Sequence, residues 1–160
     1  MNILGKIIAH NKEEVEAQSK IIPLERLKKS QRLFAVRNFK KALEGKNIRI
    51  IAEIKRQSPS EKNIYPNADP AKVAKSYQLN GAAALSVVTD SHFFGGHLDF
   101  VQQVKTVVDL PILRKDFIIS KYQVWESFHA GADAILLIAD AIDFSLLSAL
   151  YHLASELGMH

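Results

Sequence analysis

The amino-terminal segment carries apolar residues at helical spacing. Ile3 and Ile7 lie on one such stripe, which is typical of an amphipathic helix. Pro23 can open a second short helix, and Gly45 is a plausible helix stop. The pattern therefore predicts helices over residues 2–45.

The pattern then changes to an alternation of short apolar runs and amphipathic segments. Predicted strands cover residues 48–54, 84–88, 111–113 and 134–138. Predicted helices cover residues 69–80, 97–107, 120–131 and 143–158. These βα units in sequence indicate a parallel sheet with crossover helices, either an open doubly wound sheet or a closed barrel. A fifth strand is expected after Gly158. The sequence has no G-x-G-x-x-G after the first strand, which disfavours a dinucleotide-binding fold.

Composition is that of a globular domain. Of the 160 residues, 48% are hydrophobic and 24% are charged, so a real core is expected. The absence of cysteine excludes disulfides, thiolate zinc sites and a cysteine nucleophile. The net charge of +4 is spread along the chain. It indicates a solvated surface or attraction for a small anionic substrate, and no basic stripe interleaved with aromatic residues suggests nucleic-acid binding.

The sequence shows no pattern typical of a membrane helix or a signal peptide. No apolar run approaches the roughly 18 residues that a membrane helix needs. The first nine residues are too short for the apolar core of a signal peptide and lead directly into charged positions. A cytoplasmic protein without membrane contact is expected.

Charged residues interrupt the predicted first and third strands near their carboxyl ends. Glu53 and Lys55 are two positions apart and share a strand face, so they predict either a mutual ion pair or a catalytic pair. Arg114 and Asp116 share one face of the third strand, and Lys115 lies on the other. This is either an ordinary polar loop start or a lysine aimed into the same mouth as Lys55. Two close ammonium groups would lower each other's pKa, which suits proton transfer.

The second strand is followed by a glycine-rich loop with two adjacent aromatic residues. Phe93 and Phe94 are either core plugs or one wall of an apolar ligand pocket. No other potential metal ligands are grouped with His92 and His97 in the sequence. Both are therefore interpreted as surface residues. Spacing alone thus indicates a barrel-type enzyme mouth with two lysines, a glutamate and aromatic walls.

Four spaced segments resemble signature motifs of the indole-3-glycerol-phosphate synthase family. They cover residues 51–60, 85–96, 113–118 and 131–138. The resemblance extends to the helices before the first strand and so covers essentially the whole chain. It implies an α/β fold of the (β/α)8 TIM-barrel family. Residues 1–46 would form a helical extension, and residues 47–160 would form the first half of the barrel, about four βα units.

The resemblance implies a carboxy-lyase of tryptophan biosynthesis. Its substrate is a small anionic phosphosugar-anthranilate, 1-(2-carboxyphenylamino)-1-deoxyribulose 5-phosphate, and no metal or organic cofactor is used. Lys115 would be the general acid for closure of the indole ring. Lys55 would bind anionic groups and assist dehydration, and Glu53 would orient these lysines. The implied substrate-binding positions are Ser58, Pro59, Phe94, Phe117 and Leu136.

Two departures from the family pattern affect function. Lys62 stands where the family usually has glycine in the first-strand loop, so that loop is expected to close differently. The family's second glutamate, its later asparagine and arginine, and its phosphate site fall beyond residue 160. A truncated chain, inactive when alone, is therefore expected. The alternative is a non-catalytic half-barrel that only self-associates through its open sheet edges.

Overall fold

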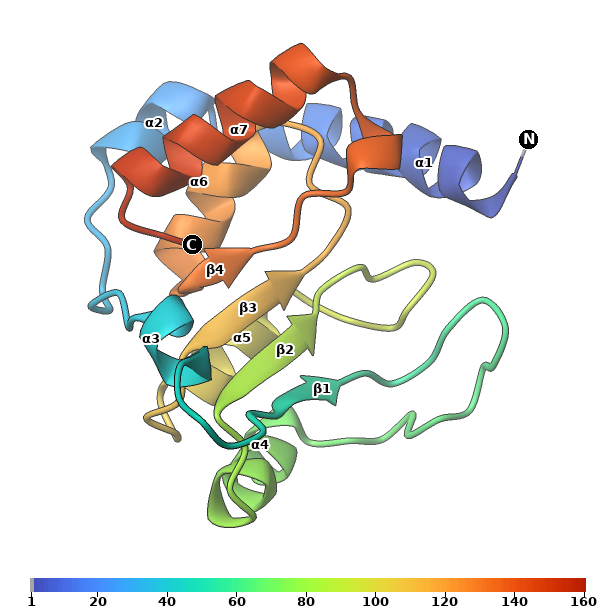
Figure 1. The fold of residues 1–160 in the computed structure, drawn as a ribbon. Coiled ribbons are helices and arrows are strands. Elements are labelled where there is room, and N and C mark those ends of the chain that lie inside the picture. Colours follow the sequence, from blue (N-terminus) through green and yellow to red (C-terminus); the bar gives the residue numbers. More distant parts are fainter. Residues whose placement is uncertain (1) are drawn as a thin grey trace.

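The protein is a parallel sheet flanked by helices, seen in a computed structural model that describes residues 2–160 (Figure 1). The sheet order is β1-β2-β3-β4, and each neighbouring pair is parallel. In chain order the elements are α1 (Ile3–Ile21), α2 (Leu24–Lys29), α3 (Phe39–Leu43), β1 (Ile51–Ile54), α4 (Pro70–Leu79), β2 (Ala84–Val88), α5 (Asp99–Lys105), β3 (Ile112–Lys115), α6 (Lys121–Ala130), β4 (Ala134–Ile135), the 3-10 turn η1 (Ala139–Ala141) and α7 (Phe144–Glu156).

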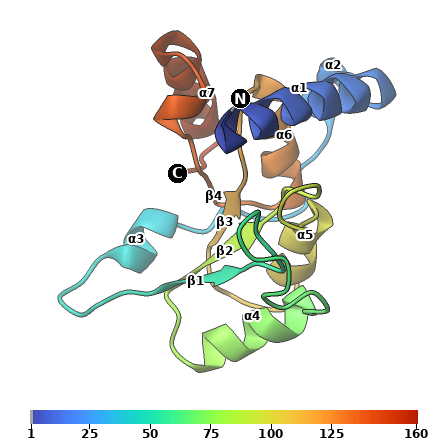
Figure 2. The same cartoon turned by 90° about the vertical axis from the view of Figure 1, so that its right-hand side faces the viewer.

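The main core lies between the sheet and its crossover helices. Leu85 and Ile112 point to this side of the strands and pack with Ala74, Val101 and Val124 of the helices, all fully buried. Figure 2 shows α4 and α5 on one side of the sheet and α3 on the other. Alternate strand residues point to opposite faces, so the same strands also present a second, inner face.

The inner face is closed at its amino end by α3. Phe39 of this helix packs on Ala84, Leu113 and Ala134, one residue from each of three neighbouring strands. This apolar layer occupies the start of the strands. The carboxyl ends of the same inner face are therefore left for polar side chains.

A buried carboxylate ties the amino-terminal segment to the sheet. Asp133 is fully buried and accepts from Lys105 Nζ at 2.5 and 2.6 Å and from the backbone N–H groups of Arg37 and Ile112. Arg32 lies 3.7 Å from the same carboxylate and donates to the Ala132 carbonyl. Burial, partly offset by Asp133, lowers the pKa of Lys105 to about 8. Four donors or cations thus converge on one acceptor at the start of β4.

Several predicted element starts are confirmed together with their caps. The strand 84–88 has the predicted bounds. Asp69 accepts from two N–H groups at the start of α4, and Ser120 and Asp143 cap α6 and α7 through their side chains. Gly131 ends α6 with a φ of 95°, a left-handed conformation that glycine adopts without strain.

Other bounds were predicted wrongly, and strand pairing explains three of them. The first strand begins at Ile51 rather than residue 48, because its partner β2 begins at Ala84. The third strand covers Ile112–Lys115 rather than 111–113, because Lys115 still pairs with Val88.

The fourth strand and the helix predicted before the third strand are both shorter than expected. The strand ends at Ile135 rather than residue 138, because its pairing with β3 stops there. The helix predicted over 97–107 covers Asp99–Lys105. Its N-cap residue Leu98 makes no side-chain capping bond, and the helix ends at Lys105, after which the Thr106 N–H makes a last helical hydrogen bond to the Gln102 carbonyl.

The outer edges of the sheet differ from one another. At the β4 edge, the His160 N–H donates to the Asp133 carbonyl, and the His160 carbonyl accepts from the Ile135 N–H. These two hydrogen bonds are those of a single parallel bridge between His160 and Ala134. In the segment just before β1, Ile48 is 94% exposed and Ile50 is 59% exposed. Within residues 2–160, no helix is both long and apolar enough to cross a membrane.

Candidate active site

The polar residues of the candidate site lie on the inner face at the carboxyl ends of the strands. Glu53 of β1 is in register with Ser86 of β2, and Val88 of β2 is in register with Lys115 of β3. Figure 2 looks onto this end of the sheet, with α1 above β4 and beside α6. Ligands of parallel α/β proteins bind at this end.

Glu53 bridges the two lysines that the sequence predicted to share a mouth. Its Oε1 lies 3.2 Å from Lys55 Nζ, and its Oε2 lies 3.2 Å from Lys115 Nζ. Ser86 Oγ donates to Oε2 at 3.4 Å. The mutual ion pair of Glu53 and Lys55 is therefore present, but it is part of a larger group in which one carboxylate serves two ammonium groups.

The two ammonium groups favour the ionised form of Glu53. Burial alone would raise the pKa of this carboxyl, but Lys115 and Lys55 outweigh it and hold the pKa below its ordinary value. Each of the three side chains remains about a third exposed. An ionised Glu53 can therefore orient both lysines while they stay accessible to a ligand.

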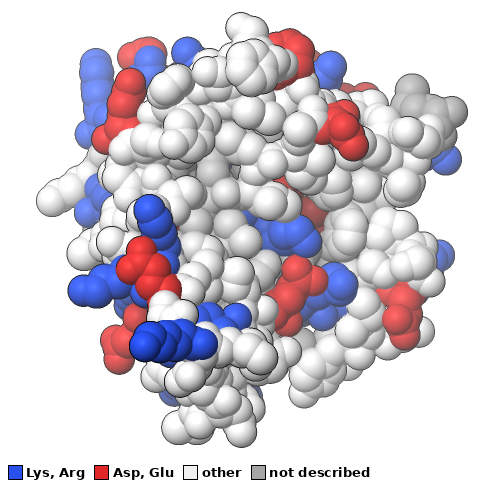
Figure 3. All heavy atoms as spheres, in the orientation of Figure 1, with Lys and Arg blue, Asp and Glu red and all other residues white. Residues whose placement is uncertain are grey.

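Apolar and aromatic side chains enclose the polar group. Phe94 and Phe117 have ring centroids 6.0 Å apart, and Val88 and Ile138 complete the wall of a cavity of about 60 Å³. Glu53, Lys55 and Lys115 line the same cavity. In Figure 3, charged side chains of both signs meet near the middle of this face, and others gather on its left side and along its top.

Two aspartates hold the backbone of the aromatic wall, and sequence reasoning gave them no role in the site. Asp90 Oδ1 accepts from Phe93 N–H at 2.7 Å and from Phe94 N–H at 3.1 Å. Asp116 Oδ1 accepts from Phe117 N–H at 2.8 Å. A signal was available in the sequence, because each aspartate lies within two residues of a strand end and within three residues of a following phenylalanine.

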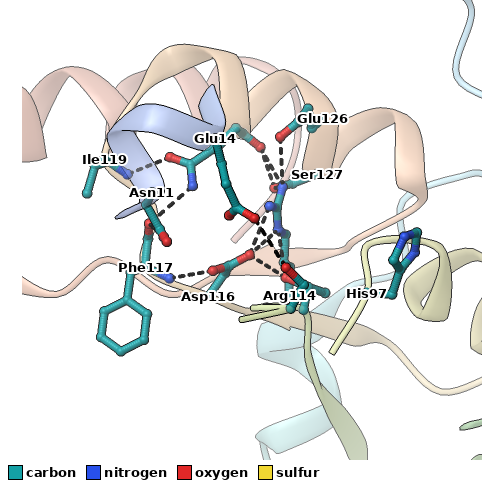
Figure 4. A network of polar contacts seen from close by, with 12 residues as sticks. Asn11, Glu14, His97, Arg114, Asp116, Phe117, Ile119, Glu126 and Ser127 are labelled. Carbon is teal, nitrogen blue, oxygen red and sulfur yellow. Dashed lines mark hydrogen bonds and ion pairs between the residues drawn. The ribbon is translucent and has the colours of Figure 1, made fainter. Parts of the chain in front are cut away.

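Arg114 and Asp116 form a buried ion pair rather than a polar loop start. Arg114 Nη2 lies 2.9 Å from Asp116 Oδ2, and both side chains are about 6% exposed. Arg114 also donates to Thr89 Oγ1, the Gln123 carbonyl and Ser127 Oγ (Figure 4). This network fixes the end of β3 and, with it, the direction of the neighbouring Lys115.

The other expected binding residues lie outside the small cavity. Ser58 is held in a local turn by two backbone hydrogen bonds with Glu61, and Pro59 is exposed. Leu136 follows the end of β4 and is partly buried. The structure thus brings together Glu53 and the two lysines with the two phenylalanines, but not these three residues.

Both histidines interpreted as surface residues are exposed. The His97 side chain is 59% exposed and lies 3.4 Å from Asp99. His92 packs its ring against His10 of α1 at a centroid distance of 4.3 Å. In the described part of the chain, no three histidine or acidic residues are grouped as metal ligands.

The charge coupling in this group predicts a titration result. Lys115→Met should raise the pKa of Glu53, because Lys115 is the strongest influence that opposes burial. Carbon NMR of the Glu53 carboxyl across a pH series measures this, with Lys72→Met as the control because Lys72 is exposed. An unchanged Glu53 titration would show that the two side chains do not interact in solution.

Comparison with known proteins decides the family. The family model described as indole-3-glycerol phosphate synthase matches residues 4–160. The chain belongs to the indole-3-glycerol phosphate synthase family. It is 44% identical over 162 residues to the indole-3-glycerol phosphate synthase of Chlorobium phaeovibrioides, covering 99% of this chain and 63% of the relative. It is 45% identical to that of Chlorobium chlorochromatii and 43% identical to that of Geobacillus thermodenitrificans, covering 63% and 59% of those proteins.

Membership of the indole-3-glycerol phosphate synthase family identifies the fold as part of a TIM barrel. The four parallel strands and their outer helices are consistent with the first units of such a barrel, preceded by α1 to α3. The chain spans about three fifths of the length of the curated relatives it matches.

Proposed function

We propose that this chain supplies the proton-transfer half of an indole-3-glycerol phosphate synthase active site. The observation that carries the proposal is the group in which Glu53 bridges Lys55 and Lys115 at the carboxyl ends of β1 and β3. Family membership supports the reaction class, a lyase of tryptophan biosynthesis. In this proposal, residues 1–46 act as an extension to the barrel segment 47–160.

Lys115 is the proposed general acid. Ring closure joins an aromatic carbon to the ribulose carbonyl carbon, so charge develops on the carbonyl oxygen. A lysine ammonium can protonate that oxygen in the transition state. Glu53 keeps the ammonium aimed inward, and the partial exposure of Lys115 allows a substrate atom to reach it.

Lys55 and the aromatic residues are the proposed binding elements. Lys55 attracts the substrate carboxylate or phosphate and assists the later loss of water. Phe94 and Phe117 wall the anthranilate ring, because their rings already face the cavity that holds the lysines. Ser58, Pro59 and Leu136 would contact the substrate only if their loops close over it.

The proposed steps are a proton transfer, a loss of carbon dioxide and a loss of water. Side chains can carry these steps, so no cofactor is required. In TIM barrels the phosphate is often bound by loops after the seventh and eighth strands. Residues 2–160 contain four strands, so we propose that activity requires the other half of a barrel.

Joining the chain to a complementary half tests the proposal. A polypeptide of these 160 residues alone should form no detectable indole product at saturating substrate. Fusion to the remaining carboxyl-terminal part of the Chlorobium chlorochromatii relative should produce the fluorescent indole product. Product formed by the isolated chain would contradict the need for a second half. A folded but inactive fusion would contradict the proposed function.

A second candidate function, self-association without catalysis, is favoured by the open β1 edge. Ile51 of β1 is exposed, and so are Ile48 and Ile50 in the segment just before it. Apolar strand edges promote pairing with another chain.

The isolated chain is therefore expected to dimerise or precipitate as its concentration rises. Light scattering over a micromolar dilution series measures this. Ile48→Lys together with Ile50→Lys should reduce association, because charged side chains protect edges. A monomer with a sharp melting transition at every concentration would contradict self-association. It would not bear on the proposed synthase function.

A further inference from the structure

The loop after β2, residues 90–96, folds back around its first residue, Asp90. Asp90 Oδ1 accepts from the Phe93 N–H at 2.7 Å and from the Phe94 N–H at 3.1 Å. The Asp90 carbonyl accepts from the Gly96 N–H at 2.8 Å. Three of the four N–H groups from Phe93 to Gly96 therefore donate to one residue.

The end of this loop packs closely against β2. A side chain at Gly96 would place its Cβ 2.4 Å from the Val88 carbonyl oxygen, so residue 96 has to be glycine. The loop is thus fixed at both of its ends, by hydrogen bonds to Asp90 and by contact with the strand. The position of the Phe94 side chain depends on this arrangement of the backbone.

The burial of the Asp90 carboxylate is costly. The residue is 4% exposed, and its Oδ2 has no hydrogen-bond partner within residues 2–160. Burial raises the pKa of Asp90 and two neighbouring carboxylates raise it further, whereas the N–H groups of Phe93 and Phe94 act in the opposite direction. A buried acceptor without a donor is rare in native proteins and calls for an explanation.

Asp90 lies beside the candidate active site but is closed to a ligand. It lines the same cavity of about 60 Å³ as Lys115, Phe94 and Phe117. Its Oδ2 has less than 1 Å² of exposed surface, and its Oδ1 is occupied by the two loop N–H groups. The carboxylate can therefore act on a bound molecule only through the loop that it holds.

The opposite ring of the aromatic wall is held by more contacts. Asp116 accepts from the Phe117 N–H through Oδ1, and its Oδ2 pairs with Arg114 at 2.9 Å. Asn11 of α1 donates to the Phe117 carbonyl at 3.1 Å. Figure 4 shows the Phe117 ring pointing away from these contacts. Phe94 is therefore the half of the wall whose backbone depends on one carboxylate.

We propose that Asp90 is a positioning residue that fixes the Phe94 ring opposite Phe117 before a substrate binds. Its two hydrogen bonds to backbone N–H groups keep the loop in one conformation, so the ring does not have to be ordered on binding. The aromatic part of the substrate then binds more tightly than it would beside a disordered loop. The effect on substrate binding rests on the proposed synthase function, whereas the effect on the loop does not.

Hydrogen exchange of the 160-residue chain tests the effect on the loop. In Asp90→Ala, the Phe93 and Phe94 amides should exchange about tenfold faster, the usual loss for a hydrogen bond to a charged group. The amide of Leu85, a fully buried residue of β2, should keep its exchange rate. Asp90→Asn should restore most of the protection, because its amide oxygen can accept the same two bonds.

Ser91→Ala is the matched control for exchange. The exposed Ser91 hydroxyl donates to Glu14 of α1 and makes no bond within the loop, so both phenylalanine amides should be unchanged. Unchanged exchange in Asp90→Ala would overturn the proposal. Equally faster exchange at Leu85 would also overturn it, because Asp90 would then stabilise the whole sheet rather than the loop.

Kinetics of the fused barrel test the effect on substrate binding. Asp90→Ala should raise KM about tenfold and leave kcat within about threefold, because the Phe94 ring contacts the substrate in the ground state and in the transition state. Phe94→Ala should raise KM as well, and adding Asp90→Ala to it should have no further effect, since the carboxylate acts through Phe94.

Two kinetic results would overturn the proposal. One is additive effects of Asp90→Ala and Phe94→Ala on KM, and the other is a fall in kcat with KM unchanged. A fused barrel without any activity would contradict the proposed synthase function instead. The exchange experiment would then decide by itself whether Asp90 positions the loop.

Discussion

Replacing Lys115 with alanine in the fused, complete barrel should lower kcat by roughly 10²–10⁴-fold and change KM little. A general acid acts mainly in the transition state, where the carbonyl oxygen takes up its proton. Glu53 keeps Lys55 as a partner at 3.2 Å, so the substitution leaves no uncompensated carboxylate. Steady-state kinetics from indole fluorescence measure both constants.

Lys72→Ala is the matched control for this experiment. Lys72 lies on α4 with a side chain that is 85% exposed, and its loss should leave kcat within a few fold. A Lys115→Ala enzyme with normal turnover and a raised KM would assign Lys115 to substrate binding. In that case Lys55 would become the better candidate for the general acid.

Asp133→Ala should lower the free energy of unfolding by about 3–5 kcal/mol, the usual loss when one partner of a buried ion pair is removed. The substitution removes the acceptor for the Lys105 ammonium, which is about 1% exposed, and for the Arg37 and Ile112 N–H groups. Release of the proton from Lys105, whose pKa is about 8, limits the loss without restoring the hydrogen bonds.

Urea unfolding followed by circular dichroism measures this difference. Asp140→Ala is the control, because Asp140 is exposed and should change stability by less than about 0.5 kcal/mol. A loss of the same small size for Asp133→Ala would mean that the four groups around this carboxylate contribute nothing net to folding.

The sequence predicted those parts of the fold that depend on local signals. Capping side chains predict where a helix begins, and the three predicted caps are present in the structure: Asp69, Ser120 and Asp143. The bounds of β1 were wrong because they depend on where the neighbouring strand begins, which β-branched residues such as Ile48 do not reveal.

The candidate site also has a part that local sequence signals predict and a part that depends on contacts between distant segments. Two-residue periodicity was enough to put Glu53 and Lys55 on one face, and strand order then brought Lys115 to them. The network around Arg114 was not foreseeable, because it joins Thr89 and Gln123 from other segments. Asn11 also joins distant parts of the chain, because its Nδ2 donates to the carbonyl of Phe117, 106 positions away.

The ties around Asp133 have a consequence for the order in which the chain folds during synthesis. Arg37 is joined to Asp133 across 96 positions, and Arg32 is joined to Ala132 across 100. Arg37 also donates to the Leu110 carbonyl, 73 positions away. The segment that carries Arg32 and Arg37 therefore cannot complete its docking until the fourth strand has been synthesised. During that interval it is open to proteases and chaperones, and its attachment closes the folding of this part of the barrel.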